Sequence, residues 1–291
     1  MGRRSELRKL NVRWLGSLSY SEALILQKGL KDSVSDEYNP YDYLLLLEHN
    51  NVITIGRTGD PKNLLFNSDE LQKKGIEFFE TDRGGDVTFH GKGQLIGYPI
   101  MRLQDPKKVI PFVRSLEETI IKTLNSFDID AFSKEDDTGV WTPKGKIASI
   151  GVKVSKWTTY HGFSLNIFDK LEGFNLINPC GNEDEKISAV HTFNKEISFD
   201  DVVNKITSTF VDEFGYKDVG IQMSQFTPTQ LKKHKKHEID EMLDKGVFQK
   251  NNNIIPITIK CLLPDEPQRP EWMKVKANLG KDYRDLKNLI S

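Results

Sequence analysis

A thiol and an amine, Cys180 and Lys146, are the side chains of this sequence best suited to covalent chemistry. A free thiol, with a pKa of about 8.5, is only a few per cent ionised at neutral pH, and the thiolate is the nucleophile. Lowering that pKa by about two units requires about 2.7 kcal/mol of preferential stabilisation of the anion. One ammonium group at about 4 Å provides about 4 kcal/mol at an effective dielectric constant of 20, before desolvation subtracts. The sequence therefore predicts that Lys146 activates Cys180.

The neighbours of Cys180 favour presentation of the thiol over burial. Pro179 and Gly181 flank it, so we expect it to lie in a loop. Lys146 begins a strand-like segment, so the sheet should fix the position of its amine. The alternative is that Cys180 is a small buried apolar residue, which is the commoner role of an isolated cysteine. We assign that inert role to Cys261, which lies in an apolar run.

A glycine-rich segment, RGGDVTFHGKGQLIGYPI, covers residues 83–100. Glycine has no Cβ, so a dense set of glycines lets the backbone approach a ligand closely. We therefore predict a binding loop around Arg83 and His90. The alternative is that the glycines only build turns, that Arg83 pairs with Asp82 and that His90 is a satisfied polar side chain. Hydrogen-bonded structural roles are expected for His49 and His191, and core packing for His161.

Alternating strand-like and helix-like patterns surround these residues through the first two thirds of the chain, which predicts an α/β fold. Residues 43–49 and 51–56 are expected to form two strands near a tight connection. Apolar and polar residues alternate along residues 146–167, which predicts two antiparallel strands joined by a short turn. Helices are expected over residues 19–34, 68–75, 109–124 and 200–214.

Two of these helices carry specific expectations. In the second, Ser68 is the expected N-cap and Leu71 is expected to point inward. The last is expected to end at Gly215. The third helix should bury one apolar stripe, made of Val109, Val113, Leu116, Ile120 and Leu124.

The composition excludes several classes of protein. The 291 residues carry 41 basic and 42 acidic side chains, so no strong field favours nucleic acid. The apolar run Leu44–Leu47 is far too short to span a membrane and predicts a buried strand. Two cysteines fit a reducing compartment, and the short basic N-terminus contains Glu6, so we expect a cytoplasmic protein, with the mitochondrial matrix as the alternative. No spacing of His, Cys and Asp indicates a metal site.

The motifs RGGDVTFHGKGQLIGYP, KIASIG, HGFSLN and NPCG, in this order, closely resemble those of the lipoyl(octanoyl)transferases. The likeness extends from about Tyr41 to about Gly215. It implies an α/β (α+β) fold, with a mixed or antiparallel sheet flanked by helices, like that of biotin protein ligases and lipoate ligases. It also implies transfer of an octanoyl chain from octanoyl-acyl carrier protein to a lysine of a lipoyl domain, as in 2-oxoacid dehydrogenases and the glycine cleavage H protein, without a cofactor.

The resemblance also assigns roles to residues. Cys180 matches the cysteine that accepts the acyl group, and Lys146 matches the lysine that lowers its pKa. Lys92 stands where the family usually has proline. Matches to the stretches that line the acyl tunnel are Arg83, Gly84, Gly85, Asp86, Val87, Thr88, Phe89, His90, Ser149, Ile150, Gly151, Gly162, Phe163 and Ser164.

The sequence changes in character after Gly215, so we predict a catalytic domain over residues 1–215 and a charged helical connector over 216–264. Residues 265–291 form a third segment, and its part Arg269–Ile290 resembles the segment that opens lipoyl synthases. The three-cysteine cluster of those enzymes is absent, so no iron–sulfur chemistry is expected. We hypothesise a fusion remnant or a piece of a transferase–synthase fusion, which makes lipoyl synthase a candidate partner.

Two other functions compete with octanoyl transfer. An ATP-dependent lipoate or biotin protein ligase has the same fold, but it requires a nucleotide. A non-catalytic module that binds lipoyl domains or carrier proteins would have an inert Cys180.

Overall fold

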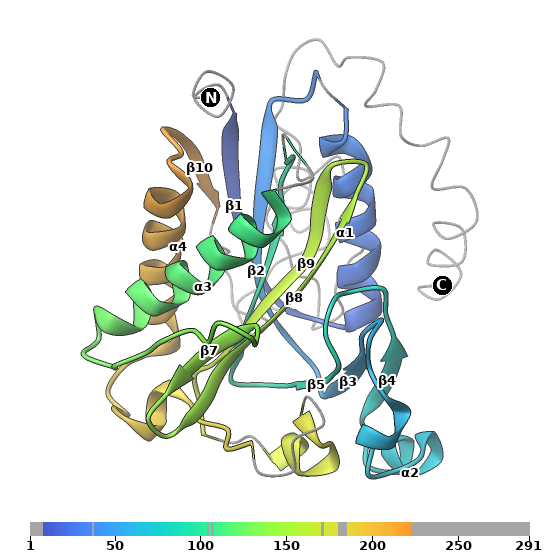
Figure 1. Ribbon diagram of the computed structural model, residues 1–291. Coiled ribbons are helices and arrows are strands. Elements are labelled where there is room, and N and C mark those ends of the chain that lie inside the picture. Colours follow the sequence, from blue (N-terminus) through green and yellow to red (C-terminus); the bar gives the residue numbers. More distant parts are fainter. Residues whose placement is uncertain are drawn as a thin grey trace, which may run out of the picture.

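The computed structural model describes residues 8–36, 38–103, 105, 108–169, 172–179 and 185–222. Within these residues a mixed seven-stranded sheet and a three-stranded sheet form the framework, with helices on the flanks as expected (Figure 1). The large sheet contains, in spatial order, β10 (Asp218–Gln222), β1 (Lys9–Leu18), β2 (Tyr41–His49), β6 (Gln94–Ile100), β9 (Thr158–Asn166), β8 (Gly145–Ser155) and β7 (Gly139–Thr142). The small sheet contains β4 (Glu77–Glu80), β3 (Val52–Ile55) and β5 (Val87–His90).

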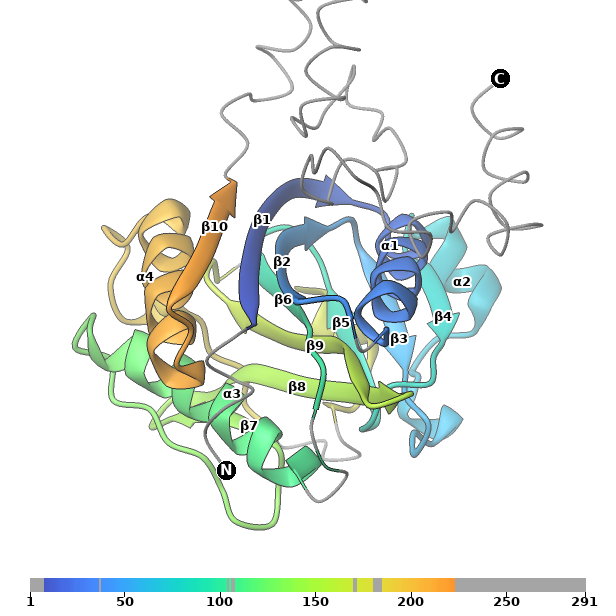
Figure 2. The same ribbon diagram turned by 90° about the horizontal axis from the view of Figure 1, so that it is seen from above.

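Helices cover both faces of the large sheet (Figure 2). The helices α3 (Val109–Asn125) and α4 (Phe199–Phe214) lie on one face, and α1 (Tyr20–Val34) lies on the other. The short α2 (Ser68–Lys73) packs against the small sheet. Short 3-10 helices are η2 (Pro61–Asn63), η4 (Glu172–Leu176) and η6 (Val190–Thr192). Among the described residues, no helix has the length and apolar character needed to cross a membrane.

Strand β2 is buried on both faces because both faces of the sheet are covered. Leu44 and Leu46 belong to the core under α3 and α4, whereas Tyr43, Leu45 and Leu47 belong to the core under α1. This division follows from the alternation of side chains along a strand. The prediction that the four leucines form a buried strand is confirmed.

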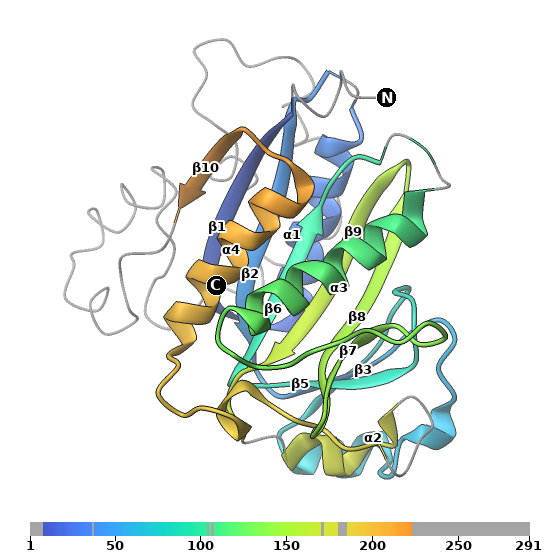
Figure 3. The ribbon, with the colours of Figure 1, turned by 60° about the vertical axis from the view of Figure 1, so that its left-hand side comes forward.

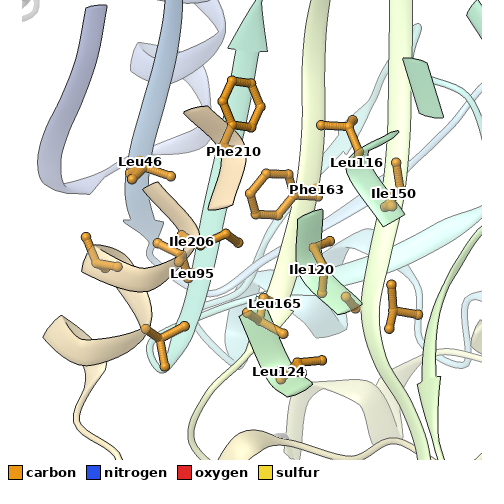
Figure 4. Close-up of a cluster of buried hydrophobic side chains, with 14 of the residues drawn as sticks. Leu46, Leu95, Leu116, Ile120, Leu124, Ile150, Phe163, Leu165, Ile206 and Phe210 are labelled. Atoms are coloured by element: carbon orange, nitrogen blue, oxygen red, sulfur yellow. The ribbon is translucent and has the colours of Figure 1, made fainter. Parts of the chain in front are cut away.

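Helix α3 lies over the hairpin of β8 and β9 (Figure 3), and its apolar stripe belongs to the same core as their side chains. Leu116 and Ile120 are fully buried, and Figure 4 shows them beside Ile150 of β8 and Phe163 of β9. Val109 and Val113, at the start of the helix, are only partly buried against the same core. The predicted stripe is therefore confirmed, and it supports the two strands that carry most of the candidate residues.

The β8–β9 hairpin has the predicted short turn. Lys156 and Trp157 form the turn with φ values of 49° and 63°. Two consecutive positive φ values match the right-handed twist of the flanking strands, as in type I′ turns. The turn fixes a register in which Gly151 lies opposite Gly162. Two of the predicted binding segments are thereby placed side by side.

The structure corrects one helix boundary and extends the sheet. The N-cap of α2 is Asn67 and not Ser68, because the Asn67 side chain accepts a hydrogen bond from the N–H of Glu70, three residues later. Leu71 is buried, as predicted. Gly215 ends α4 with a φ of 70°, as predicted, but β10 then pairs in parallel with β1, beyond the boundary that we placed at residue 215. The expected connector and tail from residue 223 onward lie outside the described residues.

Candidate active site

A cavity of about 310 Å³ lies along the β8–β9 hairpin, beside the loop that precedes β5. It brings together segments that are far apart in the sequence, from the glycine-rich loop, β8 and β9. The candidate residues that line it are Arg83, Gly84, Gly85, Asp86, Val87, Thr88, His90, Lys146, Ser149, Ile150, Gly151, Gly162, Phe163 and Ser164.

Two candidate residues are not among the lining residues. Phe89 packs in the core of the small sheet, with its ring 5.7 Å from that of Phe174. Strand alternation explains this placement, because Thr88 and His90 on either side of Phe89 line the cavity. The expectation that Phe89 lines an acyl tunnel is therefore replaced by a structural role. Cys180 lies outside the described residues.

Lys146 is the second residue of β8 and its side chain is only 4% exposed. Its Nζ lies 4.0 Å from Oδ2 of Asp137 and 4.7 Å from the centre of the Trp141 ring. Gly139 makes room for this side chain, since a Cβ there would lie 2.8 Å from Cε of Lys146. The strand, the ring and the carboxylate thus hold a buried ammonium group at one wall of the cavity.

The described residues on both sides of Cys180 are attached to the site. On the upstream side, the N–H of Asn178 donates to the carbonyl oxygen of Asn63 at 2.8 Å. On the downstream side, Nε1 of Trp141 donates to Oε1 of Glu185 at 3.0 Å, and the N–H of Lys146 donates to the carbonyl oxygen of Lys186 at 2.7 Å. In the sequence only Pro179 stands between Asn178 and Cys180.

Arg83 organises the glycine-rich loop from a buried position. Its guanidinium donates to Oγ1 and to the carbonyl oxygen of Thr54 on β3, and to the carbonyl oxygens of Gly84 and Asp86. The N–H of Gly84 donates to the carbonyl oxygen of Val152, which attaches the loop to β8. Arg83 therefore fixes the loop against the small sheet and places a positive charge beside the cavity.

The loop and β8 approach each other more closely than a side chain would allow. A Cβ at Gly151 would lie 2.7 Å from the carbonyl oxygen of Gly84. Gly85 has a φ of 84°, which a residue with a Cβ rarely adopts. The glycines therefore serve close approach of the loop to β8 and not turn formation alone, and the close approach to a ligand stays a prediction.

A polar group around His161 lies at the cavity and was not predicted as part of a site. Nε2 of His161 donates to Oδ1 of Asp82 at 3.0 Å, and the hydroxyl group of Tyr160 donates to Oδ2 of the same carboxylate. These hydrogen bonds hold the pKa of Asp82 well below its usual range, against the effect of partial burial. Burial lowers the pKa of His161 although Asp82 opposes this, so the ring is neutral at pH 7. Burial raises the pKa of Tyr20, a further lining residue, to about 12.

A second buried network of hydrogen bonds involves His49 and His90. Nδ1 of His49 donates to the carbonyl oxygen of Leu18, so its Nε2 accepts from the hydroxyl group of Tyr98, both at 2.7 Å. Burial lowers the pKa of His49 to about 4 and that of His90 to about 3, so both rings are neutral. Nδ1 of His90 donates to Oε1 of Gln94 at 3.2 Å. The structural role expected for His49 is confirmed, and Tyr98 and His90 also line the cavity.

The arrangement fits a ligand with an apolar chain and a reactive polar head. Apolar walls come from Val87, Val113, Ile150, Val152 and Phe163. The ammonium group of Lys146 lies at the start of β8, five residues and therefore about 16 Å of strand from Gly151. In the described part of the chain, no group of three or more His, Cys, Asp or Glu side chains is placed to hold a metal ion.

The sequence analysis did not assign the other lining residues to a site. Asp136, Asp137 and Thr138 come from a loop, and Tyr20 is the first residue of α1. His161 was the one of these residues that the sequence singled out, as a histidine on an apolar strand face. Its φ of 56° shows that the backbone is distorted at this point of β9.

Comparison with known proteins identifies the family of the chain. A model of the lipoyl protein ligase A/B catalytic domain family matches residues 19–211. The octanoyltransferase of Solibacter usitatus is 43% identical over 212 residues, which cover 72% of this chain and 96% of the relative. The octanoyltransferase of Caldicellulosiruptor bescii is 44% identical over 213 residues, which cover 71% of this chain and 92% of the relative.

Solved structures of lipoate ligases share the fold. A lipoate-protein ligase A bound with ATP superimposes with a TM-score of 0.62 and 17% identity, over 76% of this chain and 90% of the ligase. A bipartite lipoate protein ligase from Thermoplasma acidophilum, studied with its E2 lipoyl domain, gives a TM-score of 0.62 at 17% identity, over 90% and 100% of the two chains. The expected lipoate-ligase fold is thus confirmed. With the family match and the identity to its relatives, this chain belongs to the octanoyltransferases of the lipoyl protein ligase A/B catalytic domain family.

Proposed function

We propose that this protein transfers an octanoyl group from octanoyl-acyl carrier protein to a lysine of a lipoyl domain, through a thioester on Cys180. The observation that carries the proposal is the buried ammonium group of Lys146 at the wall of a cavity with apolar sides. The chain on both sides of Cys180 is attached beside this cavity, at Asn178 and at Glu185. Family membership supports the octanoyl group as the cargo.

In the first step the thiolate of Cys180 attacks the carbonyl carbon of the donor thioester. The bond to the pantetheine sulfur breaks, and the departing thiolate takes a proton from the Lys146 ammonium group. Cys180 then carries the octanoyl group as a thioester, and Lys146 is neutral. Backbone N–H groups near Gly151 or Gly181 are the proposed donors to the oxyanion.

In the second step a neutral lysine amine of the lipoyl domain attacks the acyl-enzyme. The amide bond forms, the Cys180 thiolate leaves, and Lys146 accepts the proton that the amine loses. Both catalytic residues return to their starting states. No ATP is consumed, because the donor thioester is already activated. Burial of the chain against Ile150 and Phe163 contributes up to about 0.8 kcal/mol per methylene.

The composition of the chain and its C-terminal segment support proposals on the cellular compartment and on a further partner. The use of only two cysteines supports a cytoplasmic protein. The likeness of Arg269–Ile290 to lipoyl synthases supports that enzyme as a further partner, and this segment lies outside the described residues.

Mass spectrometry of the protein mixed with octanoyl-acyl carrier protein tests the proposal. We expect a mass increase of one octanoyl group, which Cys180→Ala abolishes. An unchanged mass of the wild-type protein contradicts the transferase and supports a non-catalytic binding module.

The likeness to a ligase bound with ATP makes an ATP-dependent ligase the second candidate. Lipoyl domain is therefore incubated with free octanoate, with and without ATP, and separately with octanoyl-acyl carrier protein. Modification from the carrier protein without ATP supports the transferase. Modification only from free octanoate with ATP supports the ligase.

A further inference from the structure

The carboxylate of Asp86 connects two loops beside the cavity. Its Oδ1 accepts hydrogen bonds from the N–H groups of Val87 at 2.7 Å and of Asp60 at 3.2 Å. Its Oδ2 accepts from Nδ2 of Asn63 at 2.5 Å. The carboxylate therefore ties the loop of residues 56–63 to the first residue of β5, and Asp86 itself lines the cavity.

Asn63 is in turn bonded to the segment that leads to Cys180. Its carbonyl oxygen accepts from the N–H of Asn178 at 2.8 Å. The N–H of Leu65 donates to the carbonyl oxygen of Leu176 at 3.1 Å, and Leu64 and Ile177 form an antiparallel bridge between these two bonds. A continuous set of hydrogen bonds thus runs from the cavity wall at Asp86, through Asn63, to a residue two positions before Cys180.

We propose that Asp86 and Asn63 form a clamp that positions the chain entering Cys180 for acylation. The inference rests on the proposed function, because it assigns the clamp a role in the reaction of that thiol. A hydrogen bond to an ionised carboxylate is roughly twice as strong as one between neutral groups. The clamp therefore holds residues 176–178 more firmly than backbone bonds alone. Small displacements of a reacting group reduce rates steeply, so the position of this segment bears directly on the acylation rate.

The side-chain pair can be reversed without a change in net charge. Asp86→Asn removes the ionised acceptor of Nδ2 of Asn63, and a neutral hydrogen bond re-forms only where the Asn63 amide turns to present its oxygen. Asn63→Asp places two carboxylates together. The double variant Asp86→Asn/Asn63→Asp restores one donor and one acceptor in the opposite order, while Oδ1 at residue 86 still accepts the two backbone N–H groups.

The experiment measures the single-turnover rate of Cys180 acylation at saturating octanoyl-acyl carrier protein, at a temperature where circular dichroism shows every variant folded. We expect Asn63→Asp to lose at least about tenfold in rate, Asp86→Asn to lose less, and the double variant to return to within about threefold of the wild type. The pH profile of Cys180 alkylation by iodoacetamide is measured alongside, and we expect the single variants to shift it and the double variant to restore it. Asp201→Asn, which alters a capping box remote from the cavity, is the matched control and should leave both readouts unchanged.

The outcomes separate the clamp from the proposed function. A wild-type protein that is not acylated at all overturns the proposed function. A wild-type protein that is acylated, with single variants that keep the wild-type rate, overturns the clamp. Lower melting temperatures with unchanged rates and alkylation profiles also overturn it, since they show a purely structural pair. Single variants that lose rate without recovery in the double variant overturn it as well.

Discussion

The ammonium nitrogen of Lys146 lies 4.7 Å from the centre of the Trp141 ring, and the same ring donates its N–H to Glu185. Trp141 therefore contacts the proposed proton-transfer group and also the chain five residues after Cys180. A second ammonium group, that of Lys134, lies 4.3 Å from the ring centre. Desolvated cation–π contacts contribute up to about 2 kcal/mol. One side chain thus contacts both Lys146 and Glu185, a described residue that follows Cys180 in the sequence.

Substitution of Trp141 should separate its two contacts. Trp141→Phe keeps an aromatic face for Lys146 and removes the N–H that donates to Glu185. Trp141→Leu removes both contacts. We expect the acylation rate to fall about fivefold in the first variant, because the lost hydrogen bond accounts for about 1 kcal/mol, and at least about tenfold in the second, which also loses the ring face. Stopped-flow acylation of folded variants measures this, and Glu185→Gln, which keeps an acceptor, is the matched control. Equal rates in both Trp141 variants would contradict the role of the ring face.

Lys146 should control the ionisation of Cys180. Lys146→Met keeps a long side chain in the buried site and removes the charge. Loss of one ammonium group at about 4 Å should raise the pKa of the Cys180 thiol by about two units, from about 6.5 to about 8.5, which lowers the thiolate fraction at pH 7 by about 25-fold. The pH dependence of alkylation by iodoacetamide measures the shift. Alkylation profiles that coincide for the variant and the wild type would contradict the activation of Cys180 by Lys146.

The local patterns of the sequence predicted the framework better than the site. The β8–β9 hairpin, the stripe of α3 and the buried leucines of β2 follow from alternation and helical periodicity, which are properties of neighbouring residues. By contrast, β10 pairs with β1, a strand more than 200 residues earlier, and nothing in its five residues indicates this partner. His161 was expected only to pack in the core, because its partner Asp82 is 79 residues away in the sequence. Phe89 was expected to line the cavity, because a motif does not show which way each side chain points.

The close approach of the glycine-rich loop to β8 predicts that alanine destabilises the protein at Gly151 and has little effect at Gly84. Gly151→Ala places a Cβ 2.7 Å from the carbonyl oxygen of Gly84, so the loop that carries Arg83 must move. Gly84→Ala is the matched control, because its Cβ meets its nearest atom, the carbonyl oxygen of Val152, at an ordinary 3.4 Å. Overpacking of this kind costs about 1–3 kcal/mol. Urea unfolding should show that loss for Gly151→Ala and little change for Gly84→Ala. Equal stabilities of the two variants would contradict the geometry of this contact.

Burial of neutral His49 should make the protein less stable in mild acid. Its pKa is about 4 in the folded protein and about 6.5 when unfolded, so between these values the unfolded chain binds the additional proton. The contribution to stability is therefore intact above pH 6.5 and is lost as the pH falls towards 4. At pH 5 the loss amounts to about 2 kcal/mol. His49→Gln keeps a donor for Leu18 and an acceptor for Tyr98 but does not titrate.

The test compares the two proteins by urea unfolding at pH 7, 6 and 5. Carboxylates and the other histidines contribute equally to both, so the difference between the curves isolates His49. We expect His49→Gln to be less stable than the wild type at pH 7, because an amide fills the ring site incompletely. We also expect this deficit to shrink by about 2 kcal/mol at pH 5. His90→Gln provides an independent comparison, since burial lowers the pKa of His90 to about 3. Parallel stability curves for the wild type and His49→Gln would show that the pKa of residue 49 is the same in the folded and the unfolded protein, and the buried neutral network with Tyr98 would then be wrong.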